Sequence, residues 1–267
     1  LELLLAEEGV SLDAPGSAPN REATAYPLSF AQQRLWFLNQ LEPDGSGYNI
    51  FVSNRIKEPF DVGVMERCLT ELVARHETLR TNFRIEHGKP YQVIAPPAHW
   101  TLPVLDLQSL PAEARERRIA EVIAEQTSCP FDLAGEPLLR TLVIQAGPQD
   151  FLFIMVMHHI ISDAMSILVM QRELTTLYDA FRAGKPSPLP ELPFQYADYA
   201  AWQQSTLDSP AMQNQLAYWK SKLAGPLPVL ELPTDERRSS NSHMSGSQAA
   251  LLPSDFSAQL LAFAQRE

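Results

Sequence analysis

Two adjacent histidines and an aspartate follow one of the most apolar runs of the chain. The run FLFIMV at 151–156 leads through Met157 to His158, His159 and Asp163. A neutral imidazole can move protons near neutral pH, and a nearby carboxylate can fix its tautomer or brace its loop. Side chains alternate between the two faces of a strand, so the two histidines are expected to face opposite ways. The pattern indicates a proton-handling group where a strand meets a loop, without naming a reaction.

The same residues do not resemble a metal site or a serine-nucleophile site. Adjacent strand histidines cannot easily chelate one ion, and no Cys, His or Glu nearby has zinc-type spacing. Ser162 and Ser166 flank Asp163, but a serine nucleophile needs an activating base and an oxyanion hole. We therefore expect no bound metal, and we look to the histidines for chemistry.

The composition is that of a globular protein. The chain has 267 residues, 45% of them hydrophobic and 20% charged, which predicts a substantial core. A net charge of −11 argues against nucleic acid as a partner, and no apolar stretch approaches the ~18–20 residues of a membrane span. The cysteines, Cys68 and Cys129, are far apart in sequence, and the acidic opening LELLLAEEGV is unlike a signal peptide. These features fit the cytoplasm, where thiols stay reduced.

Helical and strand patterns alternate along the chain, which predicts a mixed α/β fold. Ser29 and Gln32 form a capping-box pattern at the start of one helix, and Asp61 can cap another. On the apolar side of that second helix His76 is expected to be a satisfied core residue. Helices are predicted at 29–38, 62–79, 111–127 (capped near Ser109), 164–181, 194–205, 210–223 and after Ser254, and strands at 48–52, 81–85, 91–94, 138–145, 151–157 and 246–252.

Four segments in this order resemble the condensation domains of nonribosomal peptide synthetases. They are SFAQQRLWFL at 29–38, RHETLRTNF at 75–83, MHHIISDAMS at 157–166 and YADYAAW at 196–202. The resemblance covers roughly 25–267 and implies a chloramphenicol acetyltransferase-like fold, an α+β two-layer sandwich in each of two pseudo-symmetric lobes with the active site between them.

The resemblance also divides the chain. Residues 1–24 have linker composition and are expected to lead from an upstream domain, most simply a carrier domain. Residues 25–185 would form the N-terminal lobe. Residues 186–267 would hold a Pro-rich joint and only the beginning of the second lobe, which we expect to be incomplete.

The resemblance implies a specific reaction. An upstream carrier presents an aminoacyl or peptidyl thioester on its phosphopantetheine arm, and a downstream carrier presents the attacking amine. Both carriers and a neighbouring adenylation domain would be partners, and the domain would need no cofactor of its own. The first motif favours a donor of L configuration. Two alternatives stay open: an epimerisation domain, which shares the histidine motif, and a catalytically silent module that only docks a partner protein.

The resemblance assigns roles to five residues. His159 would be catalytic, as a base, as a group that orients the amine or as one that stabilises the intermediate, and His158 would pack at the strand end. Asp163 would brace the loop through an ion pair with Arg80. Ala164 stands where the family usually has Gly. Its methyl group can strain the loop or narrow the path of the donor arm, so activity is expected to be reduced, altered or lost.

Overall fold

The computed structural model describes residues 25–86, 88–135, 137–230 and 250–266. The chain forms two compact units, 1–217 and 218–267. The predicted connector at 1–24 and most of the strand predicted at 246–252 lie outside the described residues, and 250–252 carry no regular structure.

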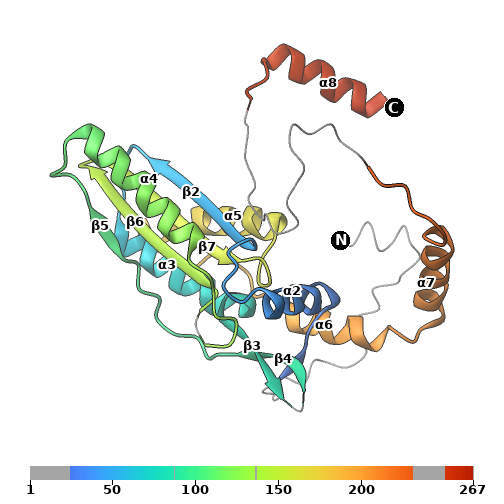
Figure 1. Ribbon diagram of the computed structural model, residues 1–267. Coiled ribbons are helices and arrows are strands. Elements are labelled where there is room, and N and C mark those ends of the chain that lie inside the picture. The colour runs from blue at the N-terminus through green and yellow to red at the C-terminus, as the bar shows by residue number, and fades with distance from the viewer. Residues whose placement is uncertain (1–24, 87, 136, 231–249, 267) are drawn as a thin grey trace. The chain divides into compact units, whose positions relative to one another are not determined.

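A four-stranded sheet forms the centre of the first unit (Figure 1). Its order is β2 (Asn49–Ile56), β7 (Asp150–His158), β6 (Leu139–Gly147) and β5 (Val104–Asp106). β7 is antiparallel to both neighbours, and only β5 pairs in parallel, with β6. Every residue of β7 from Phe151 to His158 is buried, as expected for a continuous apolar run covered on both faces. The strand that leads to the histidines is therefore a central one.

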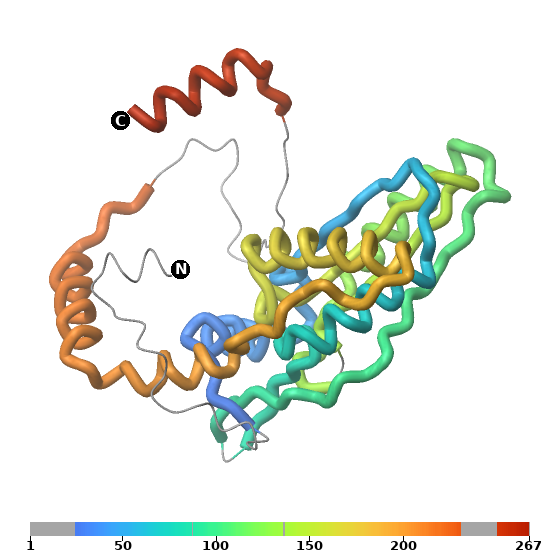
Figure 2. The backbone as a smooth tube through the Cα atoms, turned by 180° about the vertical axis from the view of Figure 1, so that it is seen from behind, coloured from blue at the N-terminus to red at the C-terminus, as the bar shows by residue number. Residues whose placement is uncertain are grey.

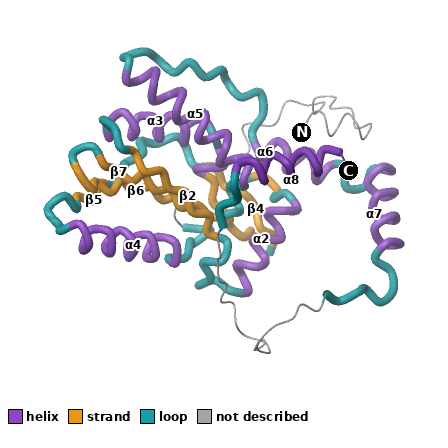
Figure 3. Tube along the Cα trace, turned by 90° about the horizontal axis from the view of Figure 1, so that it is seen from above, coloured by secondary structure: helices purple, strands orange, loops and turns teal. Residues whose placement is uncertain are grey.

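Helices cover both faces of this sheet (Figure 3). α3 (Val62–Arg75) and α5 (Ala164–Arg182) pack together on one face, and α4 (Ala112–Ser128) lies on the other. Asp61 caps α3 as predicted, whereas the N-cap of α4 is Pro111 rather than Ser109. The core between the layers contains the apolar stripes of α3 and α5: Met65, Leu69, Leu72, Met170, Leu174 and Leu177.

A smaller sheet and two helices complete the unit. The sheet has the order β1 (Tyr26–Pro27), β4 (Lys89–Ile94) and β3 (Thr81–Glu86), preceded by the short helix η1 (Glu77–Arg80). α2 (Phe30–Leu41) begins with the predicted capping box of Ser29 and Gln32. α6 (Tyr196–Ser205) packs against β1 and η1, so this helix belongs with the first unit although it follows the joint at residue 185.

The remaining helices are α7 (Pro210–Lys222) and α8 (Ser254–Arg266). The boundary between the two units falls within α7, after Ala217, and α8 belongs to the second unit. The predicted mixed α/β class is confirmed. The lobe boundaries at 25–185 and 186–267 stay predictions. Among the described helices, none has the length and apolarity needed to cross a bilayer.

Candidate active site

A cavity of about 840 Å³ lies in the first unit, and the predicted histidine loop forms part of its wall. The other walls come from α2, η1, the first two turns of α5 and the segment that leads into α6. Apolar side chains and three tyrosines share the lining with polar side chains that include Arg34, His76, His159, Asp163 and Gln195. A hollow that combines apolar walls with convergent polar groups is typical of a ligand site.

The two histidines have different environments. His158 is 2% exposed, and its Nδ1 accepts the Ile160 backbone N–H at 3.0 Å. Burial, aided by the neighbouring His159, lowers the pKa of His158 to about 4, so its ring is neutral at physiological pH. His159 is exposed and lines the cavity, while its backbone N–H donates to Tyr48 O at 2.8 Å. Strand alternation therefore presents only His159 to the cavity, as the sequence predicts.

Asp163 is the N-cap of α5. Its Oδ1 accepts the backbone N–H and the hydroxyl of Ser166 at 2.8 and 2.7 Å, and the Asp163 N–H donates to Ser166 Oγ at 3.2 Å. Burial raises the pKa of the Asp163 carboxyl, but the hydrogen bonds from Ser166 and the nearby His159 outweigh burial and hold the pKa below its usual value. An ionised carboxylate at a helix N-terminus also compensates the helix dipole. Asp163 thus fixes the end of the histidine loop to α5.

The predicted ion pair between Asp163 and Arg80 is wrong. Arg80 donates instead to the carbonyls of Ala95 and, at 3.5 Å, Ala74, and its Nη2 lies 3.7 Å from Glu77 Oε1. The side chain of Arg80 closes the end of η1 against the end of β4, while the carboxylate of Asp163 is occupied by the first turn of α5. The Asp163 carboxylate is thus satisfied within the first turn of α5, whereas Arg80 bonds to groups of α3, η1 and the end of β4 and its buried Nε has no hydrogen-bond partner among the described residues.

Ala164 is the first residue of α5, where the backbone is helical and φ is negative. The glycines with positive φ in the described residues are Gly88, Gly184 and Gly225. The expectation that Ala164 strains the loop is therefore wrong, because alanine adopts helical backbone without cost. Narrowing of a donor path by the methyl group stays a prediction.

Sequence reasoning missed Glu173 and Gln195. Glu173, 5% exposed on the packed side of α5, lies with its Oε2 2.6 Å from Nε2 of His76. His76 is satisfied, as predicted, but it lies in the cavity wall instead of the core. A glutamate inside the apolar stripe of a helix was the available signal, because a buried carboxylate needs a partner. Gln195, just before α6, gave no such signal.

A metal centre finds no support in the described ranges, where no cluster of three or more His, Cys, Asp or Glu side chains is placed to hold an ion. The site in view is thus a cavity of mixed apolar and polar lining, with the exposed His159 and the Asp163–Ser166 turn in its wall.

Comparison with known proteins gives a consistent assignment. The family model described as "Condensation domain" matches residues 22–267. The chain is 45% identical to one of the linear gramicidin synthase proteins of Brevibacillus parabrevis over 79% of its own length and 3% of that protein. It is 39% identical to the phosphinothricin tripeptide synthetase PhsC of Streptomyces viridochromogenes over 90% of its length and 22% of that protein. The chain thus spans only a small part of these relatives.

Solved structures show the same fold. The X-domain from teicoplanin biosynthesis, which has also been solved in complex with OxyB, superposes with a TM-score of 0.71 at 28% identity, over 84% of this chain and 48% of that one. The first condensation domain of the calcium-dependent antibiotic synthetase gives a TM-score of 0.69 at 26% identity, over 78% and 49%. The chloramphenicol acetyltransferase-like fold class is confirmed, and the chain belongs to the condensation-domain family.

Proposed function

We propose that this domain forms the peptide bond between two carrier-bound substrates in nonribosomal peptide synthesis. The donor is an aminoacyl or peptidyl thioester, of L configuration by the first sequence motif, and the acceptor is the amine of a second aminoacyl thioester. Both are held on phosphopantetheine arms of carrier domains, with an adenylation domain as a further neighbour. The observation that carries the proposal is the separation of the histidine pair into a buried neutral His158 and a cavity-facing His159.

Peptide-bond formation from a thioester requires mainly that the two reacting groups be positioned. The acceptor nitrogen attacks the thioester carbonyl, a C–N bond forms, and the tetrahedral intermediate then expels the donor thiolate, which takes up the proton lost by the nitrogen. Aligning two tethered reactants removes much of the entropic barrier. His159 either accepts the amine proton directly or orients the amine and stabilises the charge of the intermediate.

Substitution of His159 tests the proposal. With loaded donor and acceptor carriers, His159→Ala is expected to lower the rate of dipeptidyl-carrier formation by about 10²–10⁴-fold. The melting temperature should hold, because the ring is exposed. His99→Ala, which removes a histidine whose side chain is 65% exposed outside the cavity, is the matched control. Full turnover by folded His159→Ala would contradict the proposal.

The same assay separates two other functions. An epimerisation domain would exchange the α-proton of the tethered residue without forming dipeptide. A docking module would bind a partner without either reaction. The similarity to the X-domain keeps this second candidate in view.

A further inference from the structure

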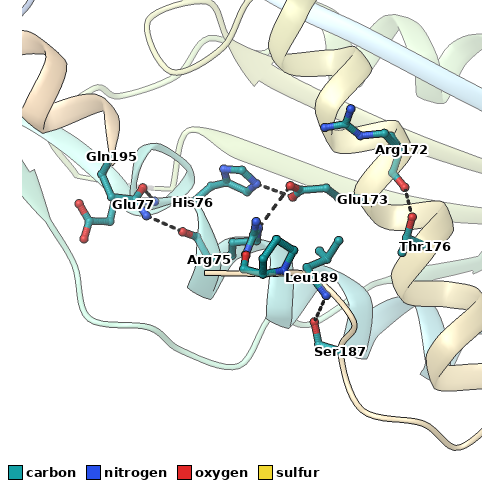
Figure 4. Close-up of polar contacts among 10 residues, drawn as sticks. Arg75, His76, Glu77, Arg172, Glu173, Thr176, Ser187, Leu189 and Gln195 are labelled. Carbon is teal, nitrogen blue, oxygen red and sulfur yellow. Dashed lines mark hydrogen bonds and ion pairs between the residues drawn. The ribbon is translucent and has the colours of Figure 1, made fainter. Parts of the chain in front are cut away.

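Three charged or titratable side chains, Arg75, His76 and Glu173, form a network away from the histidine motif (Figure 4), and His76 among them lines the same cavity. The carboxylate of Glu173 serves two partners: Oε2 lies 2.6 Å from His76 Nε2, and Oε1 lies 3.3 Å from Arg75 Nε. The side chains of Glu173 and Arg75 are 6% and 11% exposed. The network joins the C-terminal end of α3 to the middle of α5.

Arg75 also holds the segment that returns from α5 to α6, residues 189–195, here called the strap (Figure 2). While its Nε faces Glu173, its Nη1 donates to the carbonyl of Pro190. The other end of the strap is tied to the same place: Gln195 Nε2 donates to Arg75 O at 2.9 Å, and the Glu77 N–H donates to Gln195 Oε1 at 3.1 Å. The strap is therefore fastened at both ends to the end of α3.

Two apolar side chains between these anchors, Leu192 and Phe194, line the cavity. Phe194 is 49% exposed, so the fold does not depend on its burial. Prolines at 190 and 193 restrict the strap backbone further. Glu173 lies ten residues beyond Asp163 on α5, about 15 Å along the helix axis. The network that holds the strap is thus about three helical turns along α5 from Asp163.

The Arg75–Glu173–His76 network is better suited to a role in substrate selectivity than to a role in folding stability. Apolar side chains of similar size in place of a buried ionic network are often as stable, so such a network is weak evidence for a role in stability. The planar guanidinium of Arg75 holds Glu173 and Pro190 at once through different nitrogens, which the single ammonium of lysine does not match in geometry. What the network fixes is the position of the strap.

We propose that Arg75 and Glu173 are positioning residues that hold Leu192 and Phe194 as an apolar selectivity wall for the side chain of a carrier-bound aminoacyl substrate. The inference rests on the proposed function and deepens it. Large apolar side chains gain contact with this wall, and small ones do not. Since one methylene in an apolar pocket changes discrimination by about 10-fold or more, the wall favours leucine-like and phenylalanine-like substrates over alanine.

Binding of unreactive probes tests the wall. The pantetheine amides of alanine, leucine and phenylalanine are titrated calorimetrically into the full chain and its variants, without any condensation step. For the wild type the phenylalanine probe should bind at least 10-fold more tightly than the alanine probe. Phe194→Ala should bring the affinities of the phenylalanine and alanine probes close to each other. Phe37→Ala on α2, 57% exposed and outside the cavity, should leave the ratio of the two affinities unchanged.

Arg75→Lys tests the positioning role. It keeps the charge beside Glu173 but loses the forked geometry, and the probe ratio is expected to fall about threefold or more. A purely structural role would instead weaken all three probes equally. If Arg75→Lys does not fold, Leu192→Ala joins Phe194→Ala in deciding the outcome. Unchanged ratios in the folded variants overturn the inference.

Failure of this inference is distinguishable from failure of the proposed function. Equal affinity of the wild type for the three probes counts against the selectivity wall alone. Intact discrimination in a chain that forms no dipeptide counts against peptide-bond formation alone.

Discussion

Burial of His158 predicts a specific loss of stability in acid. The folded ring has a pKa of about 4, against 6.5 for a free imidazole, because burial disfavours its charged form. Protonation of Nδ1 would also break the hydrogen bond from the Ile160 N–H. The unfolded state binds this proton more readily, so stability is fully present above pH 6.5 and is lost as the pH falls toward 4. Relative to pH 7, the loss from this one residue amounts to about 2 kcal/mol at pH 5 and about 3 kcal/mol at pH 4.

His158→Asn isolates this effect, because the amide oxygen can accept the Ile160 N–H but does not titrate in this range. The free energy of unfolding is measured by urea denaturation at pH 7 and pH 5 for both proteins. The variant is expected to be less stable at pH 7, yet to lose about 2 kcal/mol less between the two pH values than the wild type. His99→Asn, on an exposed histidine, controls for the removal of a ring. An identical pH dependence in wild type and His158→Asn would refute the reasoning.

Three further predictions concern residues near the motif and the thiols. Asp163→Ala should lower stability by about 0.5–2 kcal/mol through loss of the N-cap, measured by thermal melting. In a double-mutant cycle Asp163→Ala should couple to Arg80→Ala by less than about 0.5 kcal/mol, and stronger coupling would indicate an Asp163–Arg80 ion pair after all. Ala164→Gly should cost about 0.5–1 kcal/mol and should not raise the melting temperature, as it would if the loop were strained. Iodoacetamide at pH 8 should label exposed Cys129 but not Cys68, which is fully buried with its pKa raised by burial to about 12; labelling of native Cys68 would contradict its burial.

Elements with local signals were predictable from sequence. The capping box at Ser29 and the apolar run at 151–157 each determine structure through neighbours a few residues away, and both formed as expected. The opposite facing of His158 and His159 was predictable for the same reason. Side chains alternate between the two faces within a single strand, whatever the strand packs against.

Contacts between distant segments were not predictable in the same way. The pairing of Asp163 with Arg80 failed because each charge found a closer partner within its own turn, Ser166 and Glu77. The contact of Glu173 with Arg75, 98 positions away in sequence, depends on how α3 and α5 pack, which one sequence leaves undetermined. Such pairs follow from packing, and the packing follows from the whole fold.

The register of β7 determines which histidine can act. Asn49 lies opposite His158, and the pairing with β2 continues without interruption to Ile56 and Phe151. A slip of one residue would turn His158 toward the cavity and force His159 into the core. The register of the strand pairing therefore decides which of two identical side chains faces the cavity. A shift in that register would have to break the pairing at all eight positions between β7 and β2. A single-residue insertion within β7 would therefore exchange the two rings while leaving the motif itself intact.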